Sequence, residues 1–261
     1  INLGDRVTVN PMGDRNAIGN GVPEGAFAPL LLVRDATLGG SIYRLPDTVS
    51  FDQAAMTEPL SVALHAVSRS GASPTDRVVV FGAGPIGLGI VAFLRQRGVS
   101  EITVVDMSSS RLQRARDLGA RQTVNPLDVE PFKALEDTLG SSSVFGWPVV
   151  NANLWFEVTG SGSVLQSIVA MAPSRARMVV VAVHHTPVPV DFQMALGKEL
   201  DFTMSLAYPD EFPEVIAILE SGAVDVSAMI SHRLPSEDFM AAFAIAQDKE
   251  ASAKVLVTFE E

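Results

Sequence analysis

The sequence predicts an α/β protein built around a doubly wound parallel sheet. Apolar runs rich in β-branched residues recur along the middle of the chain, as expected of parallel strands that are buried on both faces. Amphipathic segments with apolar residues at i, i+3 and i+4 separate these runs. Strands that alternate with helices form right-handed βαβ units, and several units in series make a doubly wound sheet.

Four apolar runs are expected to form central strands, and a fifth run is expected at the edge of the sheet. They are Val78–Phe81, Ile102–Val105, Leu154–Val158, Met178–Val183 and, at the edge, Leu200–Ala207. Helices are expected between them at Ile86–Arg97, around Leu112–Leu118 and around Val164–Val169. The segment Gly140–Asn153 contains serine, glycine and proline and is expected to be a loop.

The flanking parts of the chain are expected to mix short strands, turns and helices. Toward the N-terminus these are a strand at Val7–Val9, a loop at Asn10–Gly25, the apolar run Phe27–Val33, a strand that ends in a turn at Arg44–Asp47, helical spacing from Phe51 and a helix that begins at Pro59. Toward the C-terminus they are a helix at Glu211–Glu220, a helix with Phe239, Phe243 and Ala246, and a strand at Lys254–Phe259.

Composition and charge exclude several classes of function. The 261 residues are 47% hydrophobic, which is enough for a well-filled core, but no apolar run is long enough to span a membrane. The net charge of −11 argues against a nucleic-acid or anionic-membrane partner, because phosphate binding needs a basic face. Without cysteine the chain has no disulfide, thiolate nucleophile or cysteine-based zinc site. We therefore expect a soluble, cytoplasmic globular protein.

A glycine-rich motif follows the first predicted central strand. Gly82-Ala83-Gly84-Pro85-Ile86-Gly87 is a G-x-G-x-x-G pattern between a strand and a helix, and the next strand ends in Asp106 about twenty residues later. The first glycine permits the tight turn, the second lets the backbone approach a pyrophosphate, and the third allows close packing of helix and strand. The helix N-terminus offers N–H groups to the diphosphate. This context predicts a Rossmann-type NAD-binding domain.

Asp106 and Arg111 bear on the choice of cofactor. The Asp106 carboxylate can accept hydrogen bonds from the ribose hydroxyls of NAD and would repel the 2′-phosphate of NADP. Arg111 is expected either to lie against the adenosine part of the cofactor or to be a solvated residue of an amphipathic helix. Together with Arg114 it leaves the use of NADP open as an alternative.

Motifs in a fixed order extend this picture over the whole chain. They are Gly4-Asp5-Arg6-Val7, Tyr43–Asp47, Glu58–Ala66, the glycine motif, Phe156–Gly160, Lys198-Glu199-Leu200 and Ala253–Val257. In these motifs the chain resembles the zinc-dependent medium-chain dehydrogenase/reductase superfamily, in its polyol branch. The segment Tyr208–Val215 is similar to 2,3-butanediol dehydrogenases in particular.

The resemblance implies a division into domains. Residues 1–60 and 207–261 would form a partial, mostly β GroES-like catalytic domain, and residues 61–206 would form the inserted NAD-binding domain. It also implies that the family's cysteine and His-Glu pair, which hold catalytic zinc, would precede Ile1. The short loop Asn10–Gly25 occupies the place of a four-cysteine lobe, so no structural zinc is expected.

The resemblance further implies roles for individual residues. Glu58 matches the position whose carboxylate coordinates the catalytic zinc or its water; the alternative is a carboxylate that faces a helix N-terminus. Ser61 either faces the nicotinamide or is a small packing residue. The implied cofactor contacts are Gly82, Gly84, Pro85, Ile86, Gly87, Asp106, Arg111, Thr159, Val181 and Val183.

The four histidines allow several interpretations. His65 is expected to be a buried, hydrogen-bonded residue rather than a zinc ligand. His184 and His185 follow a strand at the carboxyl edge of the sheet, where they either line a substrate pocket or cap a loop. His232 is expected to be part of the surface structure.

The implied function is hydride transfer between NAD and a secondary alcohol or vicinal diol, with catalytic zinc, in a homodimer or homotetramer. Dimers would pair through the edge strand Leu200–Ala207. The 261 residues alone are expected to be inactive, because they hold at most one zinc ligand and a catalytic zinc needs about three. Two alternatives stay open: a zinc-free reductase of enones or quinones, which Glu58-Pro59 argues against, and a truncated NAD-binding module without chemistry.

Overall fold

The computed structural model describes residues 1–19 and 24–259, and these fall into two compact units. One unit is continuous and comprises Val62–Ala207, and the other joins Ile1–Ser61 to Tyr208–Glu261. The division falls near the start of helix α2 (Thr57–Ser70). No helix in the described ranges combines the length and the apolar character that crossing a membrane requires.

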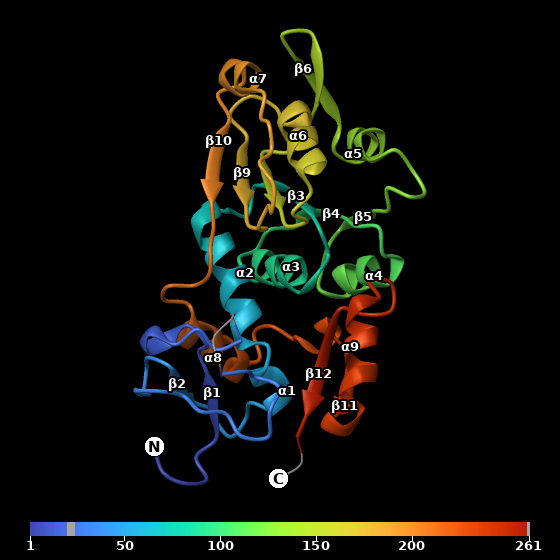
Figure 1. Cartoon of the computed structure of the whole chain (residues 1–261). Coiled ribbons are helices and arrows are strands. Elements are labelled where there is room, and N and C mark those ends of the chain that lie inside the picture. The colour runs from blue at the N-terminus through green and yellow to red at the C-terminus, as the bar shows by residue number, and fades with distance from the viewer. Residues whose placement is uncertain (20–23, 260–261) are drawn as a thin grey trace. The chain divides into compact units, whose positions relative to one another are not determined.

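The continuous unit is built on a six-stranded parallel sheet, which confirms the predicted fold class (Figure 1). The strand order is β10-β9-β8-β3-β4-β5. β3 and β8 pair although they are far apart in the sequence, so the topological switch point lies between their carboxyl ends. The six strands are β3 (Arg77–Phe81), β4 (Glu101–Val105), β5 (Gln122–Val124), β8 (Leu154–Glu157), β9 (Arg177–Val180) and β10 (Asp201–Met204).

Helices flank this sheet and bury its apolar side chains. α3 packs against α4 and β3, and the segment of α3 from Gly87 to Leu94 is buried. α5 and α6 share one apolar core with sheet residues such as Val79, Phe81 and Trp155. The helices are α3 (Pro85–Gln96), α4 (Ser109–Asp117), α5 (Pro131–Leu139), α6 (Gly162–Met171) and α7 (Phe192–Gly197).

The segment Gly140–Asn153 is not a loop, so this prediction was wrong. It forms an antiparallel hairpin of β6 (Ser141–Val144) and β7 (Trp147–Val150), which projects beyond the sheet on the side of α7 (Figure 1). Phe145 and Gly146 at the turn both have positive φ, 52° and 86°, as a two-residue hairpin turn of type I′ requires. The strand β6 was not predicted because its three consecutive serines show no alternation of apolar and polar residues.

Other elements differ from the predictions at their ends. β9 stops at Val180 rather than Val183, because the N–H groups of Val181 and Ala182 both turn to the carbonyl oxygen of Glu157. β10 is shorter than the expected Leu200–Ala207, and Ala207 has φ 56°, which is incompatible with a continuing strand. The sequence analysis did not identify β5 or α5.

The second unit contains two small sheets and short helices. β1 (Val7–Val9) pairs antiparallel with β2 (Ile42–Arg44), and β11 (Ile230–Pro235) pairs parallel with β12 (Lys254–Thr258). The helices are α1 (Phe51–Ala54), α8 (Phe212–Ser221), α9 (Phe239–Gln247) and the 3-10 turns η1 (Gly13–Arg15), η2 (Ser227–Met229) and η3 (Ser236–Asp238).

Three predictions for this unit need correction or completion. α2 begins at Thr57, so Pro59 lies within its first turn and not at its first position. The apolar run Phe27–Val33 forms neither helix nor strand, and the side chain of Leu30 is 89% exposed. Residues 20–23 of the predicted loop Asn10–Gly25 lie outside the described residues; in the described part, the Asp14 carboxylate accepts hydrogen bonds from the N–H groups of Thr37 and Ser41.

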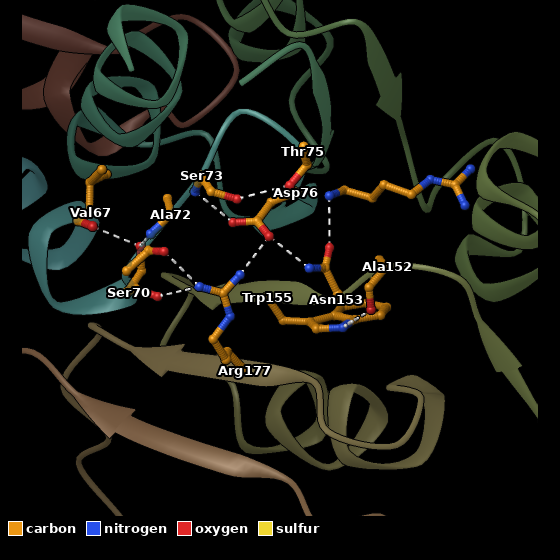
Figure 2. A network of polar contacts seen from close by, with 12 residues as sticks. Val67, Ser70, Ala72, Ser73, Thr75, Asp76, Ala152, Asn153, Trp155 and Arg177 are labelled. Carbon is orange, nitrogen blue, oxygen red and sulfur yellow. Dashed lines mark hydrogen bonds and ion pairs between the residues drawn. The ribbon is translucent and has the colours of Figure 1, made fainter. Parts of the chain in front are cut away.

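A polar network ties the sheet of the continuous unit together at its amino edge (Figure 2). Asp76, just before β3, accepts hydrogen bonds from Arg177 Nη2 at 2.6 Å, Asn153 Nδ2 at 2.7 Å and the Ser73 N–H at 2.7 Å. Arg177 also donates to the carbonyl oxygens of Ser70 and Gly71. Burial raises the pKa of Asp76, but these hydrogen bonds outweigh it, so the net pKa is lowered.

Arg177→Ala should therefore lower the free energy of unfolding by about 2–4 kcal/mol, because it leaves a buried carboxylate without its cation. Urea denaturation measures this loss. The contribution of Asp76 is complete above the unfolded-state pKa of about 3.9 and disappears as the pH falls through the lowered folded-state pKa. The matched control is Arg175→Ala, whose pair with Glu199 is exposed and whose urea midpoint should hardly change. Equal midpoints for both variants would contradict the prediction.

Candidate functional site

The carboxyl edge of the parallel sheet carries the glycine-rich turn. Gly82 follows β3 directly and has φ 105°, in the region that favours glycine. A Cβ at Gly82 would lie 3.0 Å from the carbonyl oxygen of Val158, the residue after β8. The turn therefore lies at the switch point between β3 and β8, where doubly wound sheets bind their ligands.

Gly87 and Gly84 lack side chains for different reasons. A Cβ at Gly87, in the first turn of α3, would lie 1.8 Å from the carbonyl oxygen of Gly82, so internal packing excludes a side chain there. Gly84 is the N-cap of α3, where Pro85 and Ile86 open the helix; its φ is −69°, and a Cβ would meet nothing within 4 Å. Neither backbone nor packing requires glycine at this position. The open space before the helix N-terminus fits a diphosphate group.

Asp106 is held against the glycine-rich turn. Its Oδ2 accepts a hydrogen bond from the Ala83 N–H at 2.7 Å, and its Oδ1 accepts one from the Ser108 N–H at 2.8 Å. Each carboxylate oxygen has further acceptor capacity, so a ribose hydroxyl can still donate to it. Arg111 lies in the first turn of α4, where its N–H donates to the Ser108 hydroxyl at 3.2 Å.

A second carboxylate at this edge has no role in the sequence analysis. Glu157, the last residue of β8, is fully buried, and its carboxylate accepts a hydrogen bond from the Thr159 N–H at 2.7 Å. Nε2 of His184 lies 3.0 Å from Glu157 Oε2, whereas His185 is exposed. A lone charge within the apolar run Leu154–Val158 was the feature of the sequence that could have identified it.

The cofactor contacts implied near Glu157 lie on two adjacent segments. Thr159 is exposed, and its N–H and hydroxyl both donate to the Glu157 carboxylate. Val181 donates its N–H to the Glu157 carbonyl oxygen at 3.0 Å, and Val183 is 63% exposed. The continuous unit thus brings the implied contacts together at one edge of its sheet.

Glu58 lies in the other unit, in the first turn of α2. Burial raises the pKa of this carboxyl group, and the Lys254 ammonium and the Tyr208 hydroxyl partly offset the effect. Burial also lowers the pKa of Lys254, which the negative charge of Glu58 opposes. Glu58 is therefore a half-buried carboxylate within the electrostatic reach of a lysine and a tyrosine that the sequence analysis did not assign to a site.

Two hydroxyl groups of this unit are buried without satisfied hydrogen bonds. Within the described residues, neither Tyr208 Oη nor Thr57 Oγ1 makes a hydrogen bond of normal length and angle. Burial and then the Glu58 carboxylate raise the pKa of Tyr208. The Tyr208 ring packs against Phe212, with the ring centroids 5.6 Å apart, which holds the hydroxyl in place. A buried polar atom without a partner calls for an explanation, and a catalytic role or a bound water or ion would supply one.

The remaining candidate residues have structural contacts. Ser61 is fully buried, and its hydroxyl donates to the Thr57 carbonyl oxygen at 2.7 Å. His65 is half-buried in α2, and His232 Nδ1 lies 3.1 Å from the Ser231 hydroxyl. Across residues 1–19 and 24–259, no group of three histidine, aspartate or glutamate side chains could hold a metal ion. Glu58 is thus a single carboxylate rather than part of a visible metal centre.

A six-stranded parallel sheet with a glycine-rich turn at its switch point defines a Rossmann-type nucleotide-binding fold. Residues 85–221, just over half of the chain, match the family model described as zinc-binding dehydrogenase, and the chain belongs to this family. This match confirms the resemblance to the zinc-dependent medium-chain dehydrogenases.

Three similar proteins indicate the branch of the family. Sorbitol dehydrogenase of Rattus norvegicus is 32% identical over 82% of this chain and 58% of its own length. The (R,R)-butanediol dehydrogenase of Neisseria gonorrhoeae is 30% identical over 94% of this chain and 66% of its own length. A solved alcohol dehydrogenase of E. coli CFT073, complexed with NADH, has a TM-score of 0.76 and 27% identity, over 84% of this chain and 63% of the other. The chain spans less than two thirds of the length of each.

Proposed function

We propose that the intact protein is an NAD- and zinc-dependent dehydrogenase that transfers a hydride between NAD and a secondary alcohol or vicinal diol. The observation that carries the proposal is the open space at Gly84. Neither the backbone conformation nor the packing of the protein requires a glycine at this position. This space, the N-terminus of α3 and the Asp106 carboxylate together fit a dinucleotide. The sorbitol and butanediol dehydrogenases among the similar proteins support the substrate class.

The chain's own residues have defined tasks in this proposal. The N–H groups at the start of α3 bind the diphosphate, and Asp106 orients the adenosine ribose. Thr159, Val181 and Val183 lie where the nicotinamide half would be bound. A nicotinamide supplies the hydride acceptor when it is bound, and the protein contributes position and orientation.

Asp106 should make the protein prefer NADH over NADPH by about 10- to 100-fold in affinity, which corresponds to about 1.4–2.7 kcal/mol. The reason is repulsion between the carboxylate and the 2′-phosphate. Asp106→Ser should reduce this ratio mainly by strengthening NADPH binding, as measured by fluorescence titration of both cofactors. Asp128→Ser, which removes an exposed carboxylate beyond β5, is the matched control and should keep the wild-type ratio. Equal affinities in the wild type would refute the proposed preference.

The proposed zinc residue is Glu58. A half-buried carboxylate fits a site that takes up a cation, because a positive charge offsets the cost of burying the carboxylate; the Lys254 ammonium is the cation that the chain itself brings within reach. Zinc, when bound, polarises the substrate oxygen and lowers the pKa of the alcohol. Within this chain Glu58 supplies the negative charge, and the ring contact with Phe212 fixes Tyr208 next to it.

We also propose identities for the two units. The continuous unit would be the NAD-binding domain, expected at residues 61–206, and the unit that contains Glu58 would be part of a GroES-like catalytic domain. The parallel pair β11–β12 and the antiparallel pair β1–β2 are the sheets that support this assignment, although α1, α8 and α9 together contain more residues than these four strands, so the unit is not mostly β. The cytoplasmic location expected from the sequence stays a prediction.

A homodimer through β10 is the proposed assembly. β10 is an edge strand, and the N–H groups of Asp201 and Ser205 both point to β9. Backbone alternation therefore directs the N–H of Met204 away from β9, to the side on which a partner strand would pair. The side chain of Met204 is 58% exposed.

Met204→Pro should convert the dimer into a monomer at micromolar concentration, because proline removes this donor from the sheet edge. Sedimentation velocity measures the mass of the intact protein. Met204→Ala is the matched control and should remain dimeric, since it keeps the N–H. A wild-type monomer, or a dimeric proline variant, would rule out pairing through this edge.

A further inference from the structure

One buried carboxylate holds both segments that lie beside the switch point. Oε1 of Glu157 accepts hydrogen bonds from the N–H groups of Thr159, at 2.7 Å, and Gly160, at 3.0 Å, and also from the Thr159 hydroxyl. Oε2 lies 3.0 Å from Nε2 of His184. The backbone carbonyl oxygen of the same residue accepts the N–H of Val181 at 3.0 Å. Glu157 thus connects residues 159–160 to residues 181–184.

The two segments are in close contact with each other and with the glycine-rich turn. A Cβ at Gly160 would lie 3.1 Å from the carbonyl oxygen of Val183. A Cβ at Gly82 would lie 3.3 Å from Cγ2 of Thr159. A small displacement of residues 159–160 would therefore be passed to residues 181–183.

His184 depends on Glu157 for its orientation. A carboxylate oxygen accepts hydrogen bonds, so Nε2 of His184 donates its N–H to Oε2. Nδ1 is buried and has no hydrogen-bond partner among the described residues. The contact with Glu157 is the one hydrogen bond that the structure gives this side chain, which is 15% exposed.

We propose that Glu157 and His184 form a positioning pair, which fixes residues 159–160 and 181–184 for the nicotinamide half of the cofactor. The proposal rests on the proposed NAD-dependent function. It deepens that function, because it assigns the alignment of the nicotinamide to two side chains that act through the backbone. The glycine-rich turn and Asp106 hold the other half of the cofactor, and Asp106 bonds to Ala83 rather than to this pair.

The experiment compares two ligands that share one half of the cofactor. NADH contains the nicotinamide, and ADP-ribose lacks it, so ADP-ribose reports only on the glycine-rich turn and Asp106. The 261-residue chain is titrated with each ligand by calorimetry. His184→Asn should weaken NADH binding by about tenfold or more and change ADP-ribose binding less than about twofold. Asparagine is polar but too short to place its amide nitrogen where Nε2 lies.

Two further variants give the test its specificity. His184→Gln should restore NADH affinity to within about threefold of the wild type, because the glutamine amide nitrogen reaches the place of Nε2 and can donate to Glu157. His185→Asn is the matched control at the adjacent, exposed histidine and should bind both ligands normally. If His184→Asn does not fold, Thr159→Val removes another donor to the same carboxylate and carries the same expectation.

The outcomes separate this inference from the proposed function. Equal losses for NADH and ADP-ribose would mean that the pair only stabilises the fold, and unchanged NADH affinity would mean that the pair does not position the nicotinamide. Failure of His184→Gln to restore binding would also overturn the inference. Failure of the wild type to bind ADP-ribose would overturn the NAD-dependent function itself, and the inference with it.

Discussion

Gly84→Ala should weaken NADH binding by about 5- to 150-fold and leave the thermal midpoint unchanged. A methyl group at this position meets no protein atom within 4 Å, and φ of −69° is an ordinary value for alanine, so the folded chain tolerates the change. It would occupy the space before α3 that a diphosphate needs, and overpacking of this kind costs about 1–3 kcal/mol. Calorimetric titration with NADH and a thermal melt on the same sample measure both quantities.

Substitutions at two other glycines serve as controls for this prediction. Gly25→Ala also adds a methyl group in open space, and it should change neither NADH affinity nor stability. Gly87→Ala should lower the thermal midpoint as well as the affinity, because its Cβ would collide with the carbonyl oxygen of Gly82 at 1.8 Å. If Gly84→Ala binds NADH as tightly as the wild type does, the open space does not hold the diphosphate.

Glu58→Gln should lower the zinc affinity of the intact protein by about 10- to 100-fold and reduce turnover with a diol substrate. NADH affinity should stay nearly unchanged. Glutamine keeps the shape of the side chain but loses the negative charge that offsets a divalent cation. It also removes the negative charge that raises the pKa of Lys254 against the effect of burial. Bound zinc is measured by elemental analysis, independently of turnover.

The alternative role of Glu58 predicts a different result for the same variant. If its carboxylate only faces the N-terminus of α2, the same variant should lose about 0.3–1 kcal/mol of stability and keep normal zinc content and turnover. Asp52→Asn is a suitable control, since Asp52 is an acidic residue in the first turn of α1. It should not affect zinc content under either account.

The central fold was predictable because each of its elements has a recognisable pattern in its own local sequence. β3, β4 and β8 are continuous apolar runs, buried on both faces of a parallel sheet, and the glycine motif stands between a strand and a helix. A hydrophobic pattern reports on neighbours in the sequence, so these features needed no knowledge of distant contacts. The short strand β5 and the serine-rich hairpin have no such pattern and were missed.

The partners of the site residues were not predictable, because they come from distant parts of the chain. Tyr208 and Lys254 are neighbours of Glu58 only after the chain has passed through the whole continuous unit and returned. His184 was assigned to the correct edge of the sheet, but periodicity could not show that it bonds to Glu157. Glu157 belongs to the motif Phe156–Gly160, but only the folded structure shows that its buried carboxylate holds residues 159–160 and His184.

The polar network around Asp76 and the glycine-rich turn lie at opposite ends of the same strands. Arg77 and Arg177 begin β3 and β9 at the network, whereas Phe81 and Val180 end them on the side of the turn. A substitution that alters cofactor or substrate preference at one end therefore leaves the main cross-link of the sheet intact at the other. The network that stabilises the sheet thus lies away from the residues that selection for a new specificity would change. This separation should let the domain tolerate substitutions at the glycine-rich end during engineering.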